Sequence, residues 1–218
     1  MDSRSHAHHL DRNYRYQRHV YDLTREYYLL GRTRMISGLD LADGMSVLEI
    51  GCGTALNLIR ACRRMPGAEF HGLDLSRMML ETAARALAKH DLGSQIRLAR
   101  GDATDFDATA LFGRGTFDRV FLSYSLSMIP PWEQALDHAA RLLSAGGQLH
   151  IVDFGRCEAL PAVVRSALHA WLARFRVFPR EDLEAKLHRL AGSLDLDLDF
   201  KNLYRGYSCH AVLRRKQG

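Results

Sequence analysis

The chain has 218 residues, of which 47% are hydrophobic and 25% are charged, as expected for a globular α/β domain with a sizeable core. Seventeen glycines and five prolines are too few for a fibrous or disordered chain. No apolar stretch approaches the roughly 18 to 20 residues that span a bilayer, and the N-terminus lacks the apolar core of a secretory signal. We therefore expect a single domain over residues 1–218, located in the cytoplasm.

Thirty basic and twenty-five acidic residues leave a net charge of +5, which is compatible with an anionic membrane surface or nucleic acid and proves neither. Because no block of Lys and Arg marks a nucleic-acid tail, we expect no nucleic-acid partner. The four cysteines include no C-x-x-C pair, which argues against a disulfide framework or a structural zinc site. The cluster of His6, His8 and His9 lacks acidic or thiol partners, so we predict no metal.

The N-terminal segment differs in pattern from the rest of the chain. Residues 1–10 are polar and predict a loose tail. Over 11–38, apolar and aromatic residues recur at helical spacing and predict one or two short helices, broken near Gly31 or Gly38. Residues 1–40 are therefore expected to form a tail and a helical cap.

From residue 44, short apolar runs alternate with helical patterns. The predicted strands lie in residues 45–50, 68–74, 95–102, 117–124 and 147–155, and this alternation indicates parallel βαβ units in a doubly wound sheet. The end departs from that rhythm. Residues 158–175 form one long amphipathic pattern, and residues 194–203 and 206–215 predict two strands joined by a turn at Tyr204, Arg205 and Gly206.

A glycine-rich turn follows the first predicted strand, with the sequence Glu49-Ile50-Gly51-Cys52-Gly53-Thr54-Ala55. Glycine lets the backbone approach a ligand closely, and open α/β sheets bind ligands at the carboxyl ends of their strands. Asp74 ends the second strand about 20 residues later, where an acid can accept both hydroxyls of a ribose. Asp102 ends the third strand and would face the adenine edge of the same ligand.

Glu49 narrows the ligand class. An acid two positions before the first glycine is awkward beside a pyrophosphate but suits an ammonium group. S-adenosylmethionine carries a sulfonium and an ammonium group and no phosphate. With VLEIGCGTA, GLDLS, GDATDF and LLSAGGQLHIVDF, the chain resembles the class I S-adenosylmethionine-dependent methyltransferases from about residue 44 to the C-terminus, although Ala55 replaces the third glycine of the motif. A nucleotide-binding fold with another ligand is the alternative.

This resemblance implies an α/β fold with a doubly wound, Rossmann-like, mostly parallel seven-stranded sheet, a C-terminal antiparallel hairpin and an N-terminal helical cap. Residues 44–218 would be the cofactor-binding core. Arg32 would pair with the cofactor carboxylate or with an acid of the substrate, a surface role being the alternative. The cofactor contacts implied are Tyr21, Arg32, Glu49, Gly51, Cys52 and Gly53 at the methionine moiety, Asp74, Leu75 and Met79 at the ribose, Asp102 and Ala103 at the adenine, and Ser123 at the reacting end.

Two further features of the sequence bear on the molecule that accepts the methyl group. Pro130-Pro131-Trp132 resembles a motif of amide and adenine methyltransferases, but it follows the strand end near Ser123 and opens the next helix instead. Five tyrosines in the cap can either pack on the sheet or bind a cation through their faces. We favour packing for Tyr16 and Tyr27. Candidate substrate contacts are Tyr14, Tyr28 and Tyr124, with Tyr21 also in the pocket.

The amphipathic pattern over 160–175 combines one apolar face with arginines and a tryptophan, which is compatible with a membrane interface. A helix packed on the sheet is the reading we favour. His71 and His150 lie within apolar strands and are predicted to be core residues.

The segments YRYQRHVYDLTREYYLLGR, SYSLSMIPPWEQALDHAARLL, LHIVDFG and RFRVFPR resemble the N-methyltransferases of bacterial betaine-lipid synthesis. That resemblance implies successive methylation of the amino group of diacylglyceryl-homoserine by an enzyme peripheral to the inner membrane surface. The related phosphatidylethanolamine N-methyltransferases come second. A methyltransferase of a soluble amine or a quinone, and a cofactor-binding module without turnover, are the further alternatives. An ammonium group has no lone pair, so His19, Tyr21 and Asp153 are candidate proton acceptors.

Overall fold

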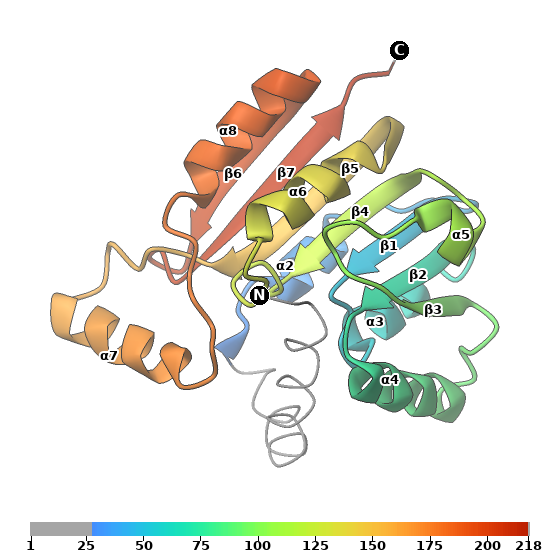
Figure 1. The fold of residues 1–218 in the computed structure, drawn as a ribbon, viewed down its shortest axis with the longest axis horizontal. Coiled ribbons are helices and arrows are strands. Elements are labelled where there is room, and N and C mark those ends of the chain that lie inside the picture. Colours follow the sequence, from blue (N-terminus) through green and yellow to red (C-terminus); the bar gives the residue numbers. More distant parts are fainter. Residues whose placement is uncertain (1–27, 218) are drawn as a thin grey trace.

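The computed structural model describes residues 28–217 of the chain. Its centre is a seven-stranded sheet in the order β3-β2-β1-β4-β5-β7-β6 (Figure 1). The strands are β1 (Ser46–Ile50), β2 (Glu69–Asp74), β3 (Ile96–Arg100), β4 (Phe117–Ser123), β5 (Leu143–Phe154), β6 (Leu196–Leu203) and β7 (Ser208–Arg215). Strands β1 to β5 pair in parallel, whereas β7 runs antiparallel to both β5 and β6. The predicted Rossmann-like, mostly parallel sheet and its C-terminal antiparallel hairpin are confirmed, whereas the tail and most of the cap predicted over residues 1–40 lie outside the described residues.

Helices cover both faces of the sheet. They are α2 (Arg32–Ser37), α3 (Leu56–Arg64), α4 (Arg77–Lys89), α5 (Ala108–Phe112), α6 (Trp132–Arg141), α7 (Ala162–Ala173) and α8 (Leu183–Leu194). One core cluster joins the sheet to α2, α3 and α4, and the other joins it to α5, α6 and α8. Neighbouring strand residues such as Val120 and Phe121 belong to opposite clusters, as the alternation of side chains along a strand requires.

Helix α8 was not expected from the sequence. Its Leu183, Leu187 and Leu190 recur at i, i+4 and i+7, and all three are buried in the same core cluster as Leu136 of α6. None of the helices among residues 28–217 is long and apolar enough to cross a bilayer.

The expectation that residues 158–175 pack on the sheet holds only for the C-terminal part of α7, where Leu172 joins the core cluster of Val152 and Phe154 and Leu168 packs against it. The helix stands to one side of the sheet (Figure 1), and Leu172 is its one buried residue. The side chain of Val163 is 81% exposed and that of Val164 is 50% exposed. The periodicity correctly predicts a helix here, but the apolar residues lie on several sides of it, so the pattern cannot identify which side has a neighbour.

Asp118 fixes the starting ends of the three central strands. Its Oδ2 accepts hydrogen bonds from the backbone N–H and the hydroxyl of Ser46, at 2.8 and 2.7 Å, and its Oδ1 accepts one from the hydroxyl of Ser144 at 2.9 Å. These bonds hold the pKa of Asp118 below its usual range, even though burial alone would raise it. With their starts fixed, β1, β4 and β5 present their carboxyl ends at one edge of the sheet.

Candidate functional site

The turn after β1 lies against the end of β2. Gly51 adopts a positive φ of 76°, and a Cβ at this position would lie 2.7 Å from the Cβ of Ser125, so only glycine fits without movement. The backbone N–H groups of Gly51 and Cys52 both donate to the carbonyl of Leu73, at 2.8 and 2.9 Å. Ala55 keeps the left-handed conformation (φ 62°) despite its methyl group and leads into α3.

Asp74 is joined to this turn. Its Oδ2 accepts the backbone N–H of Gly53 at 2.8 Å, and its Oδ1 accepts the N–H of Ser76 at 2.9 Å. A carboxylate can accept about four hydrogen bonds, so these two do not by themselves exhaust its capacity. Asp74 and Leu75 are half-buried, and Met79 is buried on the first turn of α4.

Asp102 occupies the corresponding place after β3. Its Oδ1 accepts the N–H of Thr104 at 3.1 Å and the hydroxyl of Thr104 at 2.8 Å. Asp102 and Ala103 are both half-buried. The acidic residues predicted at the ends of the second and third strands thus lie at the same edge of the sheet as the glycine-rich turn, as parallel strands require.

A hollow with an empty volume of about 390 Å³ opens at this edge, and we call it the glycine-loop pocket. Its lining includes six predicted cofactor contacts, Arg32, Glu49, Gly51, Cys52, Gly53 and Ser123, together with Leu29, Thr54, Leu56 and Asn57. The last four were not singled out from the sequence. Asn57 could have been found, because it lies on the first turn of the helix that follows a glycine-rich turn, where side chains face a bound ligand.

Buried polar groups line the glycine-loop pocket. Glu49 is 1% exposed, and its Oε1 accepts a hydrogen bond from the amide nitrogen of Asn57 at 2.7 Å. The Oδ1 of Asn57 and the hydroxyl of Ser123 are buried and have no hydrogen-bond partner within residues 28–217. Because buried polar atoms are almost always hydrogen-bonded, such atoms in a pocket wall fit a polar ligand that supplies the missing partners.

Cys52 contributes its backbone to the pocket and little reactivity. Burial, with the nearby carboxylates of Asp74 and Glu49, raises the pKa of its thiol well above the ordinary value. Burial thus disfavours the thiolate, which is the nucleophilic form of cysteine.

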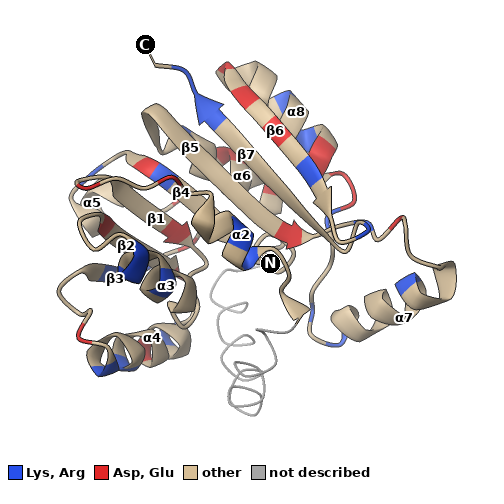
Figure 2. Cartoon of the chain, turned by 180° about the vertical axis from the view of Figure 1, so that it is seen from behind, with Lys and Arg blue, Asp and Glu red and all other residues tan. Residues whose placement is uncertain are grey.

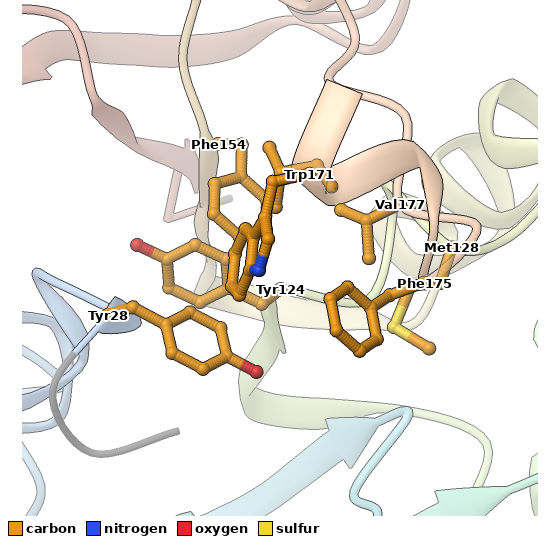
Figure 3. Close-up of a pocket in the computed structure, with 8 residues that line it drawn as sticks. Tyr28, Tyr124, Met128, Phe154, Trp171, Phe175 and Val177 are labelled. Carbon is orange, nitrogen blue, oxygen red and sulfur yellow. The ribbon is translucent and has the colours of Figure 1, made fainter. Parts of the chain in front are cut away.

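A second hollow has an empty volume of about 290 Å³, and we call it the aromatic pocket (Figure 3). Its lining is Tyr28, Tyr124, Met128, Phe154, Trp171, Leu172, Phe175 and Val177, without a charged side chain. The two pockets have no lining residue in common, but neighbours in the chain line both, since Tyr28 precedes Leu29 and Tyr124 follows Ser123. Tyr28 and Tyr124 were predicted substrate contacts, whereas Phe154, Trp171 and Phe175 were not assigned to the site.

The rings of the aromatic pocket meet edge to face. Trp171 lies 5.3 Å from Tyr28 and 5.1 Å from Phe175, and Tyr124 lies 4.7 Å from Phe154, measured between ring centroids. Edge-to-face contact is a favourable arrangement for aromatic pairs and holds each ring in one orientation. The pocket therefore presents fixed aromatic surfaces to whatever enters it.

Two tyrosines fasten the described start of the chain over this region. The hydroxyl of Tyr124 donates to the carbonyl of Leu30, and the hydroxyl of Tyr207 donates to the carbonyl of Tyr28 at 2.8 Å. Burial raises the pKa of both phenols, that of Tyr207 to about 12, so both remain neutral donors at physiological pH. They hold residues 28–30 between the two pockets.

Asp153, a predicted proton acceptor, lines neither pocket. Its Oδ2 accepts the backbone N–H of Ser127 at 3.1 Å, and its Oδ1 accepts its neighbour's N–H at 2.8 Å. Burial raises the pKa of this carboxyl. Arg180 fixes the same loop, because it donates to the carbonyls of Leu126 and Ile129 at 3.0 and 2.7 Å. The contacts of Asp153 are those of a loop anchor.

The remaining predicted residues divide into core histidines and residues outside the described part. His71 and His150 are buried in the sheet, as predicted, and burial lowers the pKa of both imidazoles. The residues outside 28–217 are His6, His8, His9, Tyr14, Tyr16, His19, Tyr21 and Tyr27. Over 28–217, no group of three His, Cys, Asp or Glu side chains is placed to hold a metal ion.

Comparison with known proteins shows what this part of the chain is similar to. Residues 47–147 match the family model described as "Methyltransferase domain". This range runs from β1 into β5 and encloses the glycine-rich turn, Asp74, Asp102 and Ser123.

Two curated relatives each match somewhat more than half of the chain. A nocamycin O-methyltransferase from Saccharothrix syringae is 30% identical over 132 residues, which are 60% of this chain and 45% of that protein. A phosphatidylethanolamine N-methyltransferase from Cereibacter sphaeroides is 33% identical over 128 residues, which are 58% of this chain and 60% of that protein. The chain thus spans about half the length of the curated relatives it matches.

Solved structures share the fold. A phosphoethanolamine N-methyltransferase from Haemonchus contortus, solved with phosphomonomethylethanolamine and S-adenosylhomocysteine, superposes with a TM-score of 0.68 at 16% identity. The superposition covers 86% of this chain and 52% of that one. The match over residues 47–147, the Rossmann-like sheet and the glycine-loop pocket all agree with a methyltransferase domain that uses S-adenosylmethionine.

Proposed function

We propose that the protein transfers methyl groups from S-adenosylmethionine to the amino group of a lipid head group, in successive steps that end in a quaternary ammonium. Diacylglyceryl-homoserine is the acceptor we favour, and phosphatidylethanolamine is the alternative. The observation that carries the proposal is the aromatic pocket, which has no charged side chain in its lining and is lined by chain neighbours of two residues of the glycine-loop pocket.

The glycine-loop pocket suits the methionine end of the cofactor. The carboxylate of Glu49 would hold the ammonium group, and the guanidinium of Arg32 would hold the carboxylate. Gly51, Cys52 and Gly53 would let the backbone approach the ligand closely. The hydroxyl of Ser123 and the Oδ1 of Asn57 would gain the hydrogen-bond partners that the protein does not supply.

The nucleoside end would extend along the neighbouring strand ends. Asp74 would accept the ribose hydroxyls, with Leu75 and Met79 beside the sugar, and Asp102 and Ala103 would meet the adenine. When bound, S-adenosylmethionine supplies a methyl group on a sulfonium, and displacement by an amine lone pair leaves a neutral thioether and a methylated ammonium.

The aromatic pocket suits an amine that is becoming a cation. Aromatic faces attract cations, and a nitrogen that gains methyl groups becomes larger, more weakly hydrated and better matched to Tyr28, Trp171 and Phe175. An apolar lining also lowers the pKa of an entering ammonium group, because desolvation disfavours the charged form. The pocket therefore favours the neutral amine, whose lone pair is required for transfer. His19 and Tyr21 are proposed to take up the released proton.

The acceptor class is supported by two of the similar proteins, whose names describe methyltransferases of ethanolamine nitrogen. The nocamycin relative is named for an oxygen acceptor. Since relatives of this domain differ in acceptor, the aromatic lining is the feature of this chain that favours nitrogen. A lipid acceptor also requires the cytoplasmic protein to work at the inner membrane surface, which we propose as its location.

The proposal is tested with the purified full chain and methyl-labelled S-adenosylmethionine. Three acceptors are offered separately: diacylglyceryl-homoserine in vesicles, free homoserine, and a demethylated quinone. We expect label in the lipid, as products with one, two and three added methyl groups. Label in homoserine or the quinone but not in the lipid would overturn the proposed acceptor. Cofactor binding without transfer to any of the three would also contradict the proposed acceptor.

A further inference from the structure

We infer that the outer face of α7 is a docking surface for an anionic lipid bilayer. This inference deepens the proposed function and rests on it for its purpose, but the surface can be tested without methyl transfer. The first observation that supports the inference is the composition of α7. Nine of the twelve residues of α7 are apolar, the exceptions being Arg165, Ser166 and His169. Helices that are apolar on all sides are normally buried in a protein core or a membrane.

The outer face of α7 is nevertheless exposed. Val163, at 81%, is the most exposed large hydrophobic residue described, and Val164 and Trp171 are 50% and 39% exposed. The exposed alanines of the helix are Ala162, Ala167, Ala170 and Ala173. Phe178 follows the helix and is 52% exposed. Exposed apolar surface gathered on one element usually marks an interaction site, unlike scattered single residues.

The charges around this face indicate which kind of partner it binds. Residues 159–180 contain four arginines and no Asp or Glu (Figure 2 shows no acidic residue on α7). Arg174 and Arg176 are exposed, whereas Arg180 is occupied by the loop carbonyls. At 3.6 residues per turn, Arg174 lies on the same side of the helix as Val163 and Ala167. An apolar face edged by unopposed arginines is complementary to anionic lipid, which combines acyl chains with negative head groups.

Trp171 connects this surface to the site, because it is partly exposed and also lines the aromatic pocket. Leu172 lines the same pocket, and Phe175 follows just beyond the helix (Figure 3). A bilayer against Val163 and Val164 would therefore lie no more than about one helix diameter from the pocket. A lipid head group could then reach the pocket while its acyl chains stay in the bilayer, so docking would lower the cost of removing the acceptor from the membrane.

The test measures flotation of the full chain with phosphatidylcholine vesicles that contain or lack phosphatidylglycerol, in the absence of cofactor. The double variant Val163→Asp/Ala167→Asp is compared with Ala84→Asp/Ala88→Asp on α4, which adds the same charge at exposed positions with the same i, i+4 spacing. We expect binding to vesicles with phosphatidylglycerol, weakened by salt. The α7 variant should bind about tenfold or more weakly, because apolar contact is lost and anionic lipid is repelled. The α4 variant should bind like the parent.

A second readout uses the fluorescence of Trp171, since the chain has two tryptophans and Trp132 is buried in the core. Its emission should shift to shorter wavelength with anionic vesicles. Equal binding by both double variants, or no flotation, would overturn the inference. So would a dimer in solution that only the α7 variant dissociates, because the face would then be a subunit interface. Vesicle binding without methylation of any lipid would leave the docking surface in place and contradict the proposed function alone.

Discussion

The carboxylate of Asp74 accepts the backbone N–H of Gly53 at 2.8 Å and so ties the end of β2 to the turn that follows β1. Its other oxygen accepts the N–H of Ser76, the N-cap residue of α4. The residue proposed to hold the ribose is therefore positioned by backbone donors on both sides. Such a carboxylate binds without reorganisation, because its orientation does not have to be selected when the ligand arrives.

Replacement of Asp74 by alanine is expected to weaken binding of S-adenosylmethionine about 30-fold or more, because hydrogen bonds to a charged group contribute about 1.5 to 3 kcal/mol each. Isothermal calorimetry measures the affinity. Asp105→Ala, which removes an exposed carboxylate a few residues from Asp102, is the matched control and should bind normally. An unchanged affinity for Asp74→Ala would contradict the placement of the ribose.

The variant Glu49→Gln tests the methionine end of the cofactor site separately from the nucleoside end. The amide keeps the size of the side chain but removes the negative charge proposed to face the ammonium group. We expect affinity for S-adenosylmethionine to fall by roughly tenfold, since a charge-assisted hydrogen bond becomes a neutral one. Affinity for methylthioadenosine, which lacks the amino-acid group, should stay within about twofold because the lost charge has no partner there. A similar loss for both ligands would point to damage of the turn instead.

The aromatic pocket predicts a defect that depends on the degree of methylation. Phe175→Leu keeps an apolar lining but removes one aromatic face, so the KM of a dimethylated acceptor should rise by about three- to thirtyfold, as the range of cation–π energies implies. The KM of the primary amine should change less. Steady-state kinetics with each acceptor, and the ratio of di- to trimethylated product, measure this. An equal rise for every acceptor would show that the ring only shapes the pocket.

The buried histidines predict a loss of stability in acid. Burial and the neighbouring His210 lower the pKa of His150 to about 3, against about 6.5 in an unfolded chain. Between these values the unfolded state takes up a proton that the folded state does not, so stability falls as the pH falls, with a slope approaching about 1.4 kcal/mol per pH unit. Burial shifts the pKa of His71 and His210 in the same direction.

Urea unfolding between pH 7 and pH 4 measures that slope. His150→Leu should flatten it by about 1 kcal/mol per pH unit, because one of the protons taken up on unfolding is removed. The same substitution at His188, which is exposed on α8, serves as the control. If His150→Leu has the slope of the parent, the imidazole is protonated in the folded state.

The sequence predicted the part of the site that depends on strand order. Gly51, Asp74 and Asp102 each follow a predicted parallel strand, and the carboxyl ends of such strands meet at one edge whatever the details of packing. The aromatic pocket could not be predicted in this way. Tyr28, Phe154 and Trp171 come from distant parts of the chain and meet through packing, which no spacing encodes.

Helix α7 is a second feature whose packing could not be predicted from the sequence. Its pattern predicted a helix, but apolar residues on several sides left its neighbour undefined, and only its C-terminal part packs against the core cluster that contains the sheet residues. Helix α8 was missed because its short leucine pattern lies next to the alternating residues 194–203, which dominate that region.

The central claim, methylation of a lipid amine, is tested most directly by mass spectrometry of lipids from cells that express the chain together with a source of diacylglyceryl-homoserine. The account predicts that this lipid gains mass in steps of one methyl group, up to three, and that Glu49→Gln reduces all three products. Methylation of phosphatidylethanolamine in its place would select the alternative acceptor. An unchanged lipid extract from cells that contain folded, cofactor-binding protein would contradict the claim.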